Sequence, residues 1–169
     1  MRVAQQAPDK TAPVLIRAAS PADLDTVLAL RLAFIAELRD QPVDALDPSF
    51  VAVSRRYLED VTTTDRIRSW LAEVDGEPVG VVSVLANDTP PLPEVHLARE
   101  GYVVNMWVLP DLRRRGVARA LLAAAVAAAP AEGWRRLYLH ATEAGRPLYE
   151  QFGFRPDARW MGTAVAGLT

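Results

Sequence analysis

The sequence predicts an α/β fold built on a mixed central sheet. Apolar runs of strand length alternate along the chain with segments of helical periodicity. The dipeptide Asp75-Gly76 separates two apolar runs and is a strong signal for a two-residue hairpin. An alanine- and leucine-rich stretch over residues 114–129 lies between two further strand-like runs, which is typical of a crossover connection. We therefore expect antiparallel and parallel neighbours in one sheet.

The first third of the chain predicts one strand followed by two helices. Residues 1–13 are polar, lack periodicity and are predicted to form a mobile arm. Residues 14–17 form an apolar run of strand type, and Ser20-Pro21 supplies an N-cap and a first helical position for a helix to about residue 39. A second helix is expected over residues 48–59.

The middle of the chain changes to strand character. Residues 69–74 and 79–85 flank the hairpin signal, and residues 102–108 form a third strand-like run that Pro110 ends. Residues 86–99 hold three prolines, so we predict a long loop there, of the kind that often carries function.

The last third predicts two helices and the remaining strands. Pro130 stops the helix over residues 114–129, and Gly153 closes a short helix over residues 146–152 as a left-handed cap. Strands are expected at residues 136–141, 154–155 and 160–165. The predicted order is β-αα-β-β-β-α-β-α-β(β), with about six to seven strands and about four helices.

Composition excludes several classes of site. The 169 residues contain no cysteine, which excludes disulfides, thiolate nucleophiles and zinc–cysteine sites. Two isolated histidines predict no metal site, and a net charge of −2 argues against a nucleic-acid surface. We find no apolar run long enough to span a membrane and no signal-peptide core, so a cytoplasmic location is expected.

Three arginines stand where the helix after residue 112 begins. The N-terminus of a helix already carries about half a positive charge, so Arg113, Arg114 and Arg115 are placed unfavourably unless an anion binds. Free N–H groups, the helix dipole and guanidinium groups together form a phosphate site. A solvated basic turn is the alternative. The spacings of a Walker loop and of a Rossmann fingerprint are both absent.

The same segment resembles a known family motif. The stretch Arg113-Arg114-Arg115-Gly116-Val117-Ala118 is similar to the acetyl-CoA motif of the GNAT N-acetyltransferases, which lies between a strand and a helix. A second stretch, over residues 146–155, resembles the family segment that carries a Leu-Tyr pair and a later Gly-Phe pair. The resemblance implies the GNAT fold, a single domain over residues 14–169, and acetyl-CoA as the acetyl donor.

The resemblance also implies which residues bind the cofactor. In the family the pyrophosphate binds to N–H groups of the motif loop, and the pantetheine runs along the preceding strand, here Met106-Trp107-Val108. The resemblance also implies that this strand parts from the next one at a bulge, which opens a slot for the thioester. Thr142 stands where many relatives have an asparagine that contacts the pantetheine. The implied cofactor-binding residues are Met106, Trp107, Val108, Arg113, Arg114, Arg115, Gly116, Val117, Ala118, Arg119 and Thr142.

Tyr149 occupies the position of the family's usual general acid. A phenol has a pKa of about 10 and is protonated at neutral pH, so it can donate to a departing thiolate. A core tyrosine on an amphipathic helix is the alternative. The base has no clear candidate, because Asn105 stands where many members carry a carboxylate. Glu37, Glu100 and Glu143 are left as bases acting through water.

These observations predict an acetyl-CoA-dependent N-acetyltransferase that acts on a primary amine. The resemblance places the acceptor between residues 30–60 and 86–100, whose acidic members suit a cationic amine. The acceptor is a small molecule or a peptide, and the protein is a monomer or a homodimer, without nucleic-acid or membrane partners. Two rival hypotheses remain open: a non-catalytic acyl-CoA sensor or scaffold, and a nucleic-acid binder that uses the arginine cluster.

Overall fold

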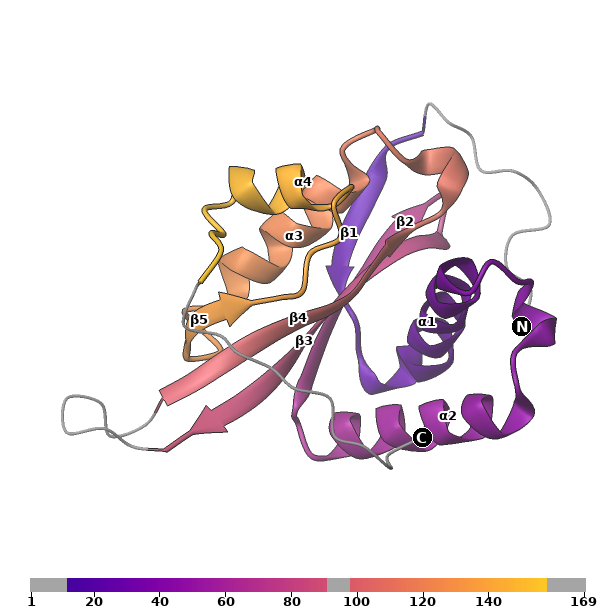
Figure 1. The fold of residues 1–169 in the computed structure, drawn as a ribbon, viewed down its shortest axis with the longest axis horizontal. Coiled ribbons are helices and arrows are strands. Elements are labelled where there is room, and N and C mark those ends of the chain that lie inside the picture. Colours follow the sequence, from indigo (N-terminus) through magenta and orange to yellow (C-terminus); the bar gives the residue numbers. More distant parts are fainter. Residues whose placement is uncertain (1–11, 91–97, 158–169) are drawn as a thin grey trace. The chain divides into compact units, whose positions relative to one another are not determined.

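The computed structural model describes residues 12–90 and 98–157 (Figure 1). The chain divides after residue 139 into two compact units. The first unit holds every described strand and three α-helices, and the second holds the short helix α4 (Arg146–Gln151). The predicted mobile arm, apart from residues 12 and 13, and the predicted strand at residues 160–165 lie outside the described residues.

The sheet of the first unit has five strands in the order β1-β2-β3-β4-β5. Neighbouring strands are antiparallel except for β4 and β5, which are parallel. The strands are β1 (Val14–Ala18), β2 (Ile67–Val74), β3 (Glu77–Thr89), β4 (Ala98–Val108) and β5 (Trp134–Tyr138). The α/β class and the mixed sheet are confirmed, while the described strands are fewer than the six to seven expected. Phe154-Arg155, predicted as a strand, pairs with no described strand.

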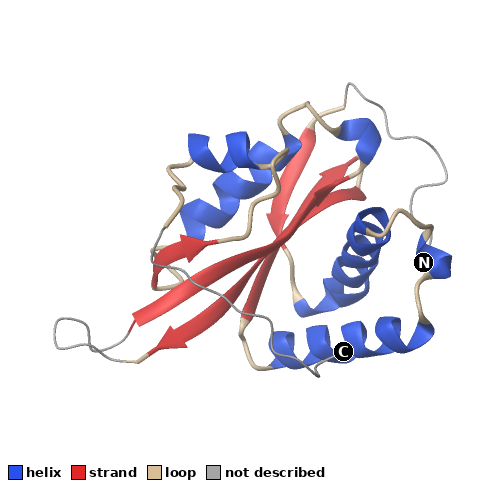
Figure 2. Ribbon diagram, viewed as in Figure 1, coloured by secondary structure: helices blue, strands red, loops and turns tan. Residues whose placement is uncertain are grey.

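Helices cover both faces of this sheet (Figures 1 and 2). The first two, α1 (Leu24–Leu38) and α2 (Pro48–Thr63), pack on one face, where their apolar side chains meet Leu71, Val81 and Trp107. On the other face lies α3 (Val117–Ala128), whose Leu121 lies close to Gly80 of β3. The core therefore has two layers separated by the sheet.

The hairpin between β2 and β3 follows from its two turn residues. Asp75 and Gly76 both have positive φ angles, 52° and 80°, and Val74 pairs with Glu77 across the turn. Two residues of left-handed backbone define the turn type that matches the twist of antiparallel strands. The prediction from the Asp-Gly pair is confirmed.

The long loop predicted over residues 86–99 is wrong at both ends. Strand β3 continues to Thr89, and β4 already begins at Ala98. The polar residues Asn87 and Asp88 pair with Glu100 and Arg99, and Arg99 and Asp88 also form an ion pair at 3.1 Å. Backbone pairing with a neighbouring strand, rather than hydrophobic pattern, makes this stretch a strand.

The described residues include no helix long and apolar enough to cross a membrane.

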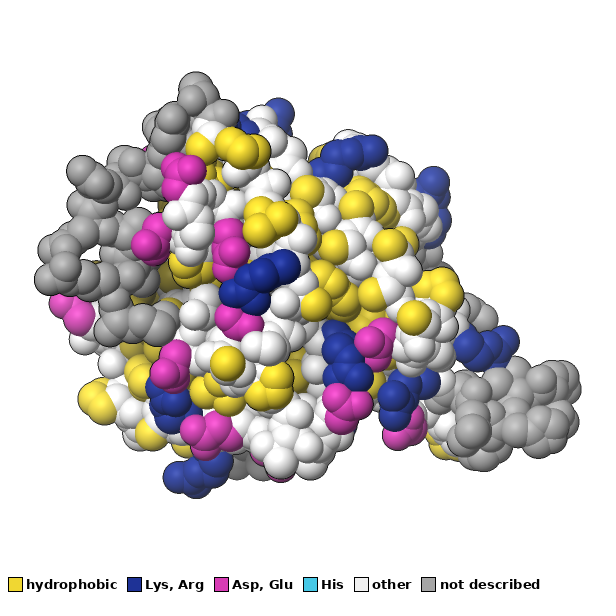
Figure 3. All heavy atoms as spheres, turned by 180° about the vertical axis from the view of Figure 1, so that it is seen from behind, with side chains coloured by type: hydrophobic (Ala, Val, Ile, Leu, Met, Phe, Trp, Pro, Cys, Tyr) yellow, Lys and Arg dark blue, Asp and Glu magenta, His cyan; other side chains and the backbone are white. Residues whose placement is uncertain are grey.

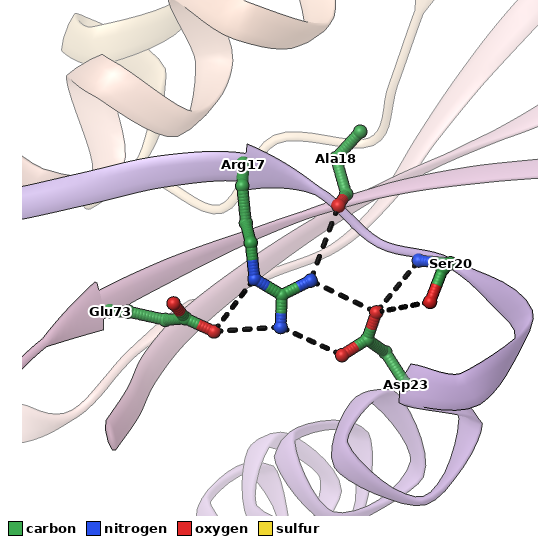
Figure 4. A network of polar contacts seen from close by, with 5 residues as sticks. All are labelled: Arg17, Ala18, Ser20, Asp23 and Glu73. Atoms are coloured by element: carbon green, nitrogen blue, oxygen red, sulfur yellow. Dashed lines mark hydrogen bonds and ion pairs between the residues drawn. The ribbon is translucent and has the colours of Figure 1, made fainter. Parts of the chain in front are cut away.

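An ion-pair network joins β1, β2 and the start of α1 (Figure 4). Arg17 on β1 donates from Nε to Glu73 on β2 at 2.9 Å, and from Nη2 to Asp23 at 2.7 Å. The carboxylate of Asp23 also accepts from the N–H group and the hydroxyl of Ser20. This network fixes the turn that leads from the sheet into α1, where Ser20 is the predicted N-cap and Pro21 the first helical residue.

The network predicts an acid-dependent contribution to stability. The Arg17 guanidinium holds the pKa of Asp23 far below its usual range, with added bonds from Ser20. A depressed carboxylate pKa stabilises the fold above the unfolded pKa, about 3.9, and this contribution is lost as the pH falls below it. Asp23→Asn should therefore lower the free energy of unfolding by about 1–3 kcal/mol at pH 7. The difference from the wild type should shrink below about pH 4, measured by urea unfolding at several pH values.

Asp25→Asn is the matched control, because Asp25 pairs with Arg55 at 2.7 Å but its side chain is 62% exposed. Such a pair contributes about 0–1 kcal/mol. A loss in Asp23→Asn that stays constant from neutral to acid pH would contradict the assigned role of Asp23.

Candidate active site

Strand β4 carries a bulge at Asn105. Ser83 pairs with Val104 and Val81 with Trp107, so one residue of β3 faces two residues of β4. Asn105 has a φ of 54°, in the left-handed region. An extra residue in one strand bends that strand and breaks the pairing locally. The bulge therefore changes the direction of β4 over its last four residues.

Asn105 suits this position by its backbone as well as by its side chain. Asparagine adopts left-handed backbone more readily than almost any other non-glycine residue. The side chain is 5% exposed, and its Oδ1 accepts a hydrogen bond from Nη1 of Arg31 on α1. Asn105 is thus the residue that shapes the bulge and connects it to α1, which gives a physical reason for an amide at this point.

On the β5 side, residues 103–108 of β4 have no described strand beside them. The parallel pairing of β4 with β5 ends at Tyr102 and Tyr138, whereas β4 continues to Val108. A strand edge of this kind presents N–H and C=O groups that an extended molecule can pair with. Residues 103–108 therefore offer a binding edge along β4.

The loop after β4 leads to a helix start with open N–H groups. Arg114 and Gly116 have positive φ angles, 62° and 81°, and Gly116 is the N-cap of α3. The first bond of the helix runs from the N–H of Ala120 to the carbonyl of Gly116. The N–H groups of Val117 and Ala118 thus have no partner within the helix. They lie in the segment for which the arginine cluster predicts a phosphate site.

Arg113 differs from the other arginines of the cluster because its side chain is bonded within the protein. Its Nη2 donates to Glu37 on α1, and its Nε donates to the carbonyl of Val108 at 3.0 Å. Glu37 also accepts from Nε1 of Trp107 at 2.8 Å. The Arg113 guanidinium, aided by that indole, holds the pKa of Glu37 below its ordinary value. Glu37 is therefore a poor base, and it ties α1 to the end of β4.

The remaining predicted residues of the loop divide into exposed and packed side chains. Arg114, Arg115 and Arg119 are exposed, whereas Val117 is buried in the core. Ala118 is half-buried, as is Met106 on β4. Trp107 is 8% exposed and belongs to the core beneath α1, so only its backbone lies at the strand edge. Among the carboxylates left as bases, Glu100 pairs with Arg136 at 3.1 Å.

The second unit contains the two other predicted site residues. Thr142 accepts from the N–H of Gly145 through its hydroxyl at 3.1 Å and so fixes the turn into α4. Tyr149 is half-buried, with its ring edge-on to Phe154 at a centroid distance of 5.9 Å. Burial raises the pKa of Tyr149, so the phenol stays protonated at neutral pH. Gly153 has a φ of 85°, which confirms the predicted left-handed cap.

On the face shown in Figure 3, basic and acidic side chains lie interspersed. The described residues contain no group of three or more His, Asp or Glu side chains that could hold a metal ion.

The family of the chain follows from its similarity to known proteins. A sequence model of the acetyltransferase (GNAT) family matches residues 32–154, which is most of the chain. The chain belongs to the GNAT acetyltransferase family. It is an acyltransferase of the N-acetyltransferase type, and its acetyl donor is acetyl-CoA. The resemblance seen in the two sequence motifs is confirmed, and no curated protein matches the chain.

Solved structures agree with this assignment. A GCN5-related N-acetyltransferase from Ralstonia eutropha is 29% identical, with a TM-score of 0.73 over 92% of this chain and 100% of that one. A predicted acetyltransferase from Clostridium acetobutylicum, solved with acetyl-CoA, is 23% identical, with a TM-score of 0.78 over 90% of this chain and 96% of that one. A ribosomal-protein-alanine N-acetyltransferase from Brucella melitensis is 27% identical, with a TM-score of 0.63 over 90% and 98% of the two chains.

Sequence reasoning missed Arg31 and its bond to Asn105. The helical pattern of α1 shows an arginine within an apolar stretch, which is a weak signal by itself. The pairing with Asn105 joins residues 74 positions apart and depends on how α1 packs on β4.

Proposed function

We propose that the chain transfers the acetyl group of acetyl-CoA to a primary amine of a small molecule or a peptide, by direct attack on the thioester. One observation carries this proposal: the open edge of β4 beyond the Asn105 bulge leads into a helix start with open N–H groups. An extended thioester arm and a pyrophosphate need these two features in this order along the chain.

The pantetheine arm is proposed to lie beside residues 106–108 of β4. Its amides would pair with backbone groups at the strand edge, as an added strand does. The pyrophosphate is proposed to bind the N–H groups at the start of α3, where Gly116 lets the backbone come close. Arg114 and Arg115 are exposed beside this point, whereas Arg113 is engaged by Glu37. Thr142, which bonds its own turn through its oxygen, can donate its hydroxyl hydrogen to the arm.

The chemistry needs a proton acceptor, a proton donor and an oxyanion site. The nitrogen of a neutral amine attacks the thioester carbonyl carbon, the C–S bond breaks, the nitrogen loses one proton to water, and the thiolate takes a proton from the acid. We propose backbone N–H groups near the bulge as donors to the tetrahedral oxyanion. We propose Tyr149 as the acid, because it occupies the position of the family's general acid and a phenol keeps its proton throughout the neutral range.

Two proteins of similar structure act on amines of different kinds. One similar structure is an aminoglycoside acetyltransferase from an uncultured soil metagenomic sample, and another acts on the alanine of a ribosomal protein. Both enzymes acetylate an amine, in one case on a small molecule and in the other on a polypeptide. Our proposal therefore covers primary amines of either kind.

Substitution of Gly116 tests the placement of the cofactor. Acetyl-CoA should raise the melting temperature of the wild type, since a ligand at a hundredfold excess over Kd stabilises the fold by about 2.7 kcal/mol. Gly116→Glu puts a negative charge and a Cβ at the proposed phosphate position and should abolish this rise. Differential scanning fluorimetry with and without acetyl-CoA measures both shifts.

Gly76→Glu is the matched control for backbone strain. Gly76 has a φ of 80°, close to the 81° of Gly116, and at both positions an added Cβ meets no other atom within 4 Å. The two variants should lose similar stability without ligand, but only Gly116→Glu should lose the response to acetyl-CoA. An equal response in both variants would show that the pyrophosphate binds elsewhere.

Substitution of Tyr149 tests the general acid. Tyr149→Phe keeps the contact with Phe154 and removes only the hydroxyl. The turnover number kcat should fall by about 10²–10⁴-fold, the usual contribution of general acid catalysis. The melting temperature and the affinity for acetyl-CoA should change little. Release of CoA with an amine panel gives kcat, and calorimetry gives the affinity.

Tyr102→Phe removes a hydroxyl from another partly buried tyrosine, which is stacked on Tyr138 at 5.0 Å. It should leave kcat nearly unchanged. A similar loss in both variants would assign the effect to structure rather than to proton donation. Binding of acetyl-CoA without CoA release to any amine would favour the sensor hypothesis instead.

A further inference from the structure

Arg31 lies where α1 contacts the bulge of β4. Its Nη1 donates to the side-chain oxygen of Asn105, the residue that forms the bulge. Its Nε is buried and has no hydrogen-bond partner in the described part of the chain. The guanidinium is therefore held at Nη1 by an uncharged amide, while its Nε–H is left without a bond in the described part of the chain.

The charge of Arg31 has no acidic partner among the described residues. Other arginines of the same unit contrast with it: Arg17, Arg68, Arg113 and Arg136 each pair with at least one carboxylate. Burial lowers the pKa of Arg31, and Tyr57 nearby opposes this effect only in part. A partly buried cation without a counter-ion is costly, and an incoming anion removes that cost.

The phosphate groups of acetyl-CoA are proposed to bind away from Arg31. The proposed pyrophosphate position is the start of α3, beyond Val108 and the following loop. From Asn105 to Val108 an extended strand spans roughly 10 Å. Arg31 reaches β4 at the bulge, which under the proposed binding mode is the acyl end of the cofactor. An anion at Arg31 therefore belongs to the molecule that meets the thioester.

We propose that Arg31 binds a carboxylate or phosphate group of the acceptor, so that the substrate is an amine that also carries an anionic group. This inference rests on the proposed function. It reverses the cationic acceptor expected from the acidic members of residues 30–60 and 86–100. Among these, Glu37 is engaged by Arg113 and Trp107, and Asp88 pairs with Arg99. A guanidinium forms two parallel bonds with a carboxylate or phosphate, which fixes the orientation of the attached amine.

Paired acceptors test this assignment. CoA release is measured with α-amino acids against their carboxamides, and with glucosamine 6-phosphate against glucosamine. For at least one pair, the wild type should have a kcat/KM about tenfold or more higher for the anionic member. A preference within the amino-acid pair would indicate a carboxylate, and a preference within the glucosamine pair a phosphate. In Arg31→Met this preference should fall to about onefold, whereas Arg31→Lys should keep part of it because the charge remains.

Arg39→Met is the control, because Arg39 is an exposed arginine at the end of the same helix. It removes the same charge and should keep the preference. Equal activity of both members of every pair in the wild type would overturn the assignment. Equal losses for both members in Arg31→Met would show that Arg31 only supports the bulge.

A binding measurement separates this inference from the proposed function. The Nε–H resonance of Arg31 is followed by NMR in the CoA-bound protein during titration with N-acetylglycine, N-acetylglycinamide and N-acetylglucosamine 6-phosphate. A shift with an anionic probe and none with the amide would support the role of Arg31, even without turnover. No shift with either anionic probe would overturn it. Failure of the proposed function would show separately, as the absence of any thermal shift with acetyl-CoA.

Discussion

The bulge at Asn105 is the constraint on which the site depends. An extra residue in β4 opposite Val82 changes which residues of β4 face α1 and which face α3. Because of this change Trp107, beyond the bulge, enters the core under α1. On the β5 side, the pairing of β4 already ends at Tyr102, before the bulge begins. The bulge thus sets the packing of the last residues of β4, next to an edge that has no described strand beside it.

Polar contacts from α1 hold this part of the sheet in place. Arg31 reaches the bulge itself, and Glu37 reaches both Trp107 and Arg113 two turns later on the same helix. Charged hydrogen bonds of this kind are stronger than neutral ones and fix geometry as well as adding stability. The helix that helps to cover the core is therefore also the element that positions the site. The two contacts differ, because Glu37 is satisfied within the protein whereas Arg31 is not.

Local signals in the sequence predicted the elements that depend on local chemistry. Asp75-Gly76 gives its hairpin, and Ser20-Pro21 starts its helix, because turn and cap preferences act over a few residues. The strand extension at Asn87 was missed, since its polar residues become strand only through pairing with β4. The bulge in β4 was expected from the family resemblance, whereas the contact of Arg31 with Asn105 was missed. That contact depends on strand register and helix packing, which no window of sequence contains.

The central claim is that acetyl-CoA occupies the edge of β4 beyond the bulge and the start of α3. Amide hydrogen exchange with and without acetyl-CoA tests it directly, because backbone groups that bind the ligand become protected. Protection should rise in residues 103–108 and 114–119, and it should change little at the far end of α2 and the start of β2. Unchanged exchange in residues 103–108 and 114–119, with protection elsewhere in the first unit, would contradict the account.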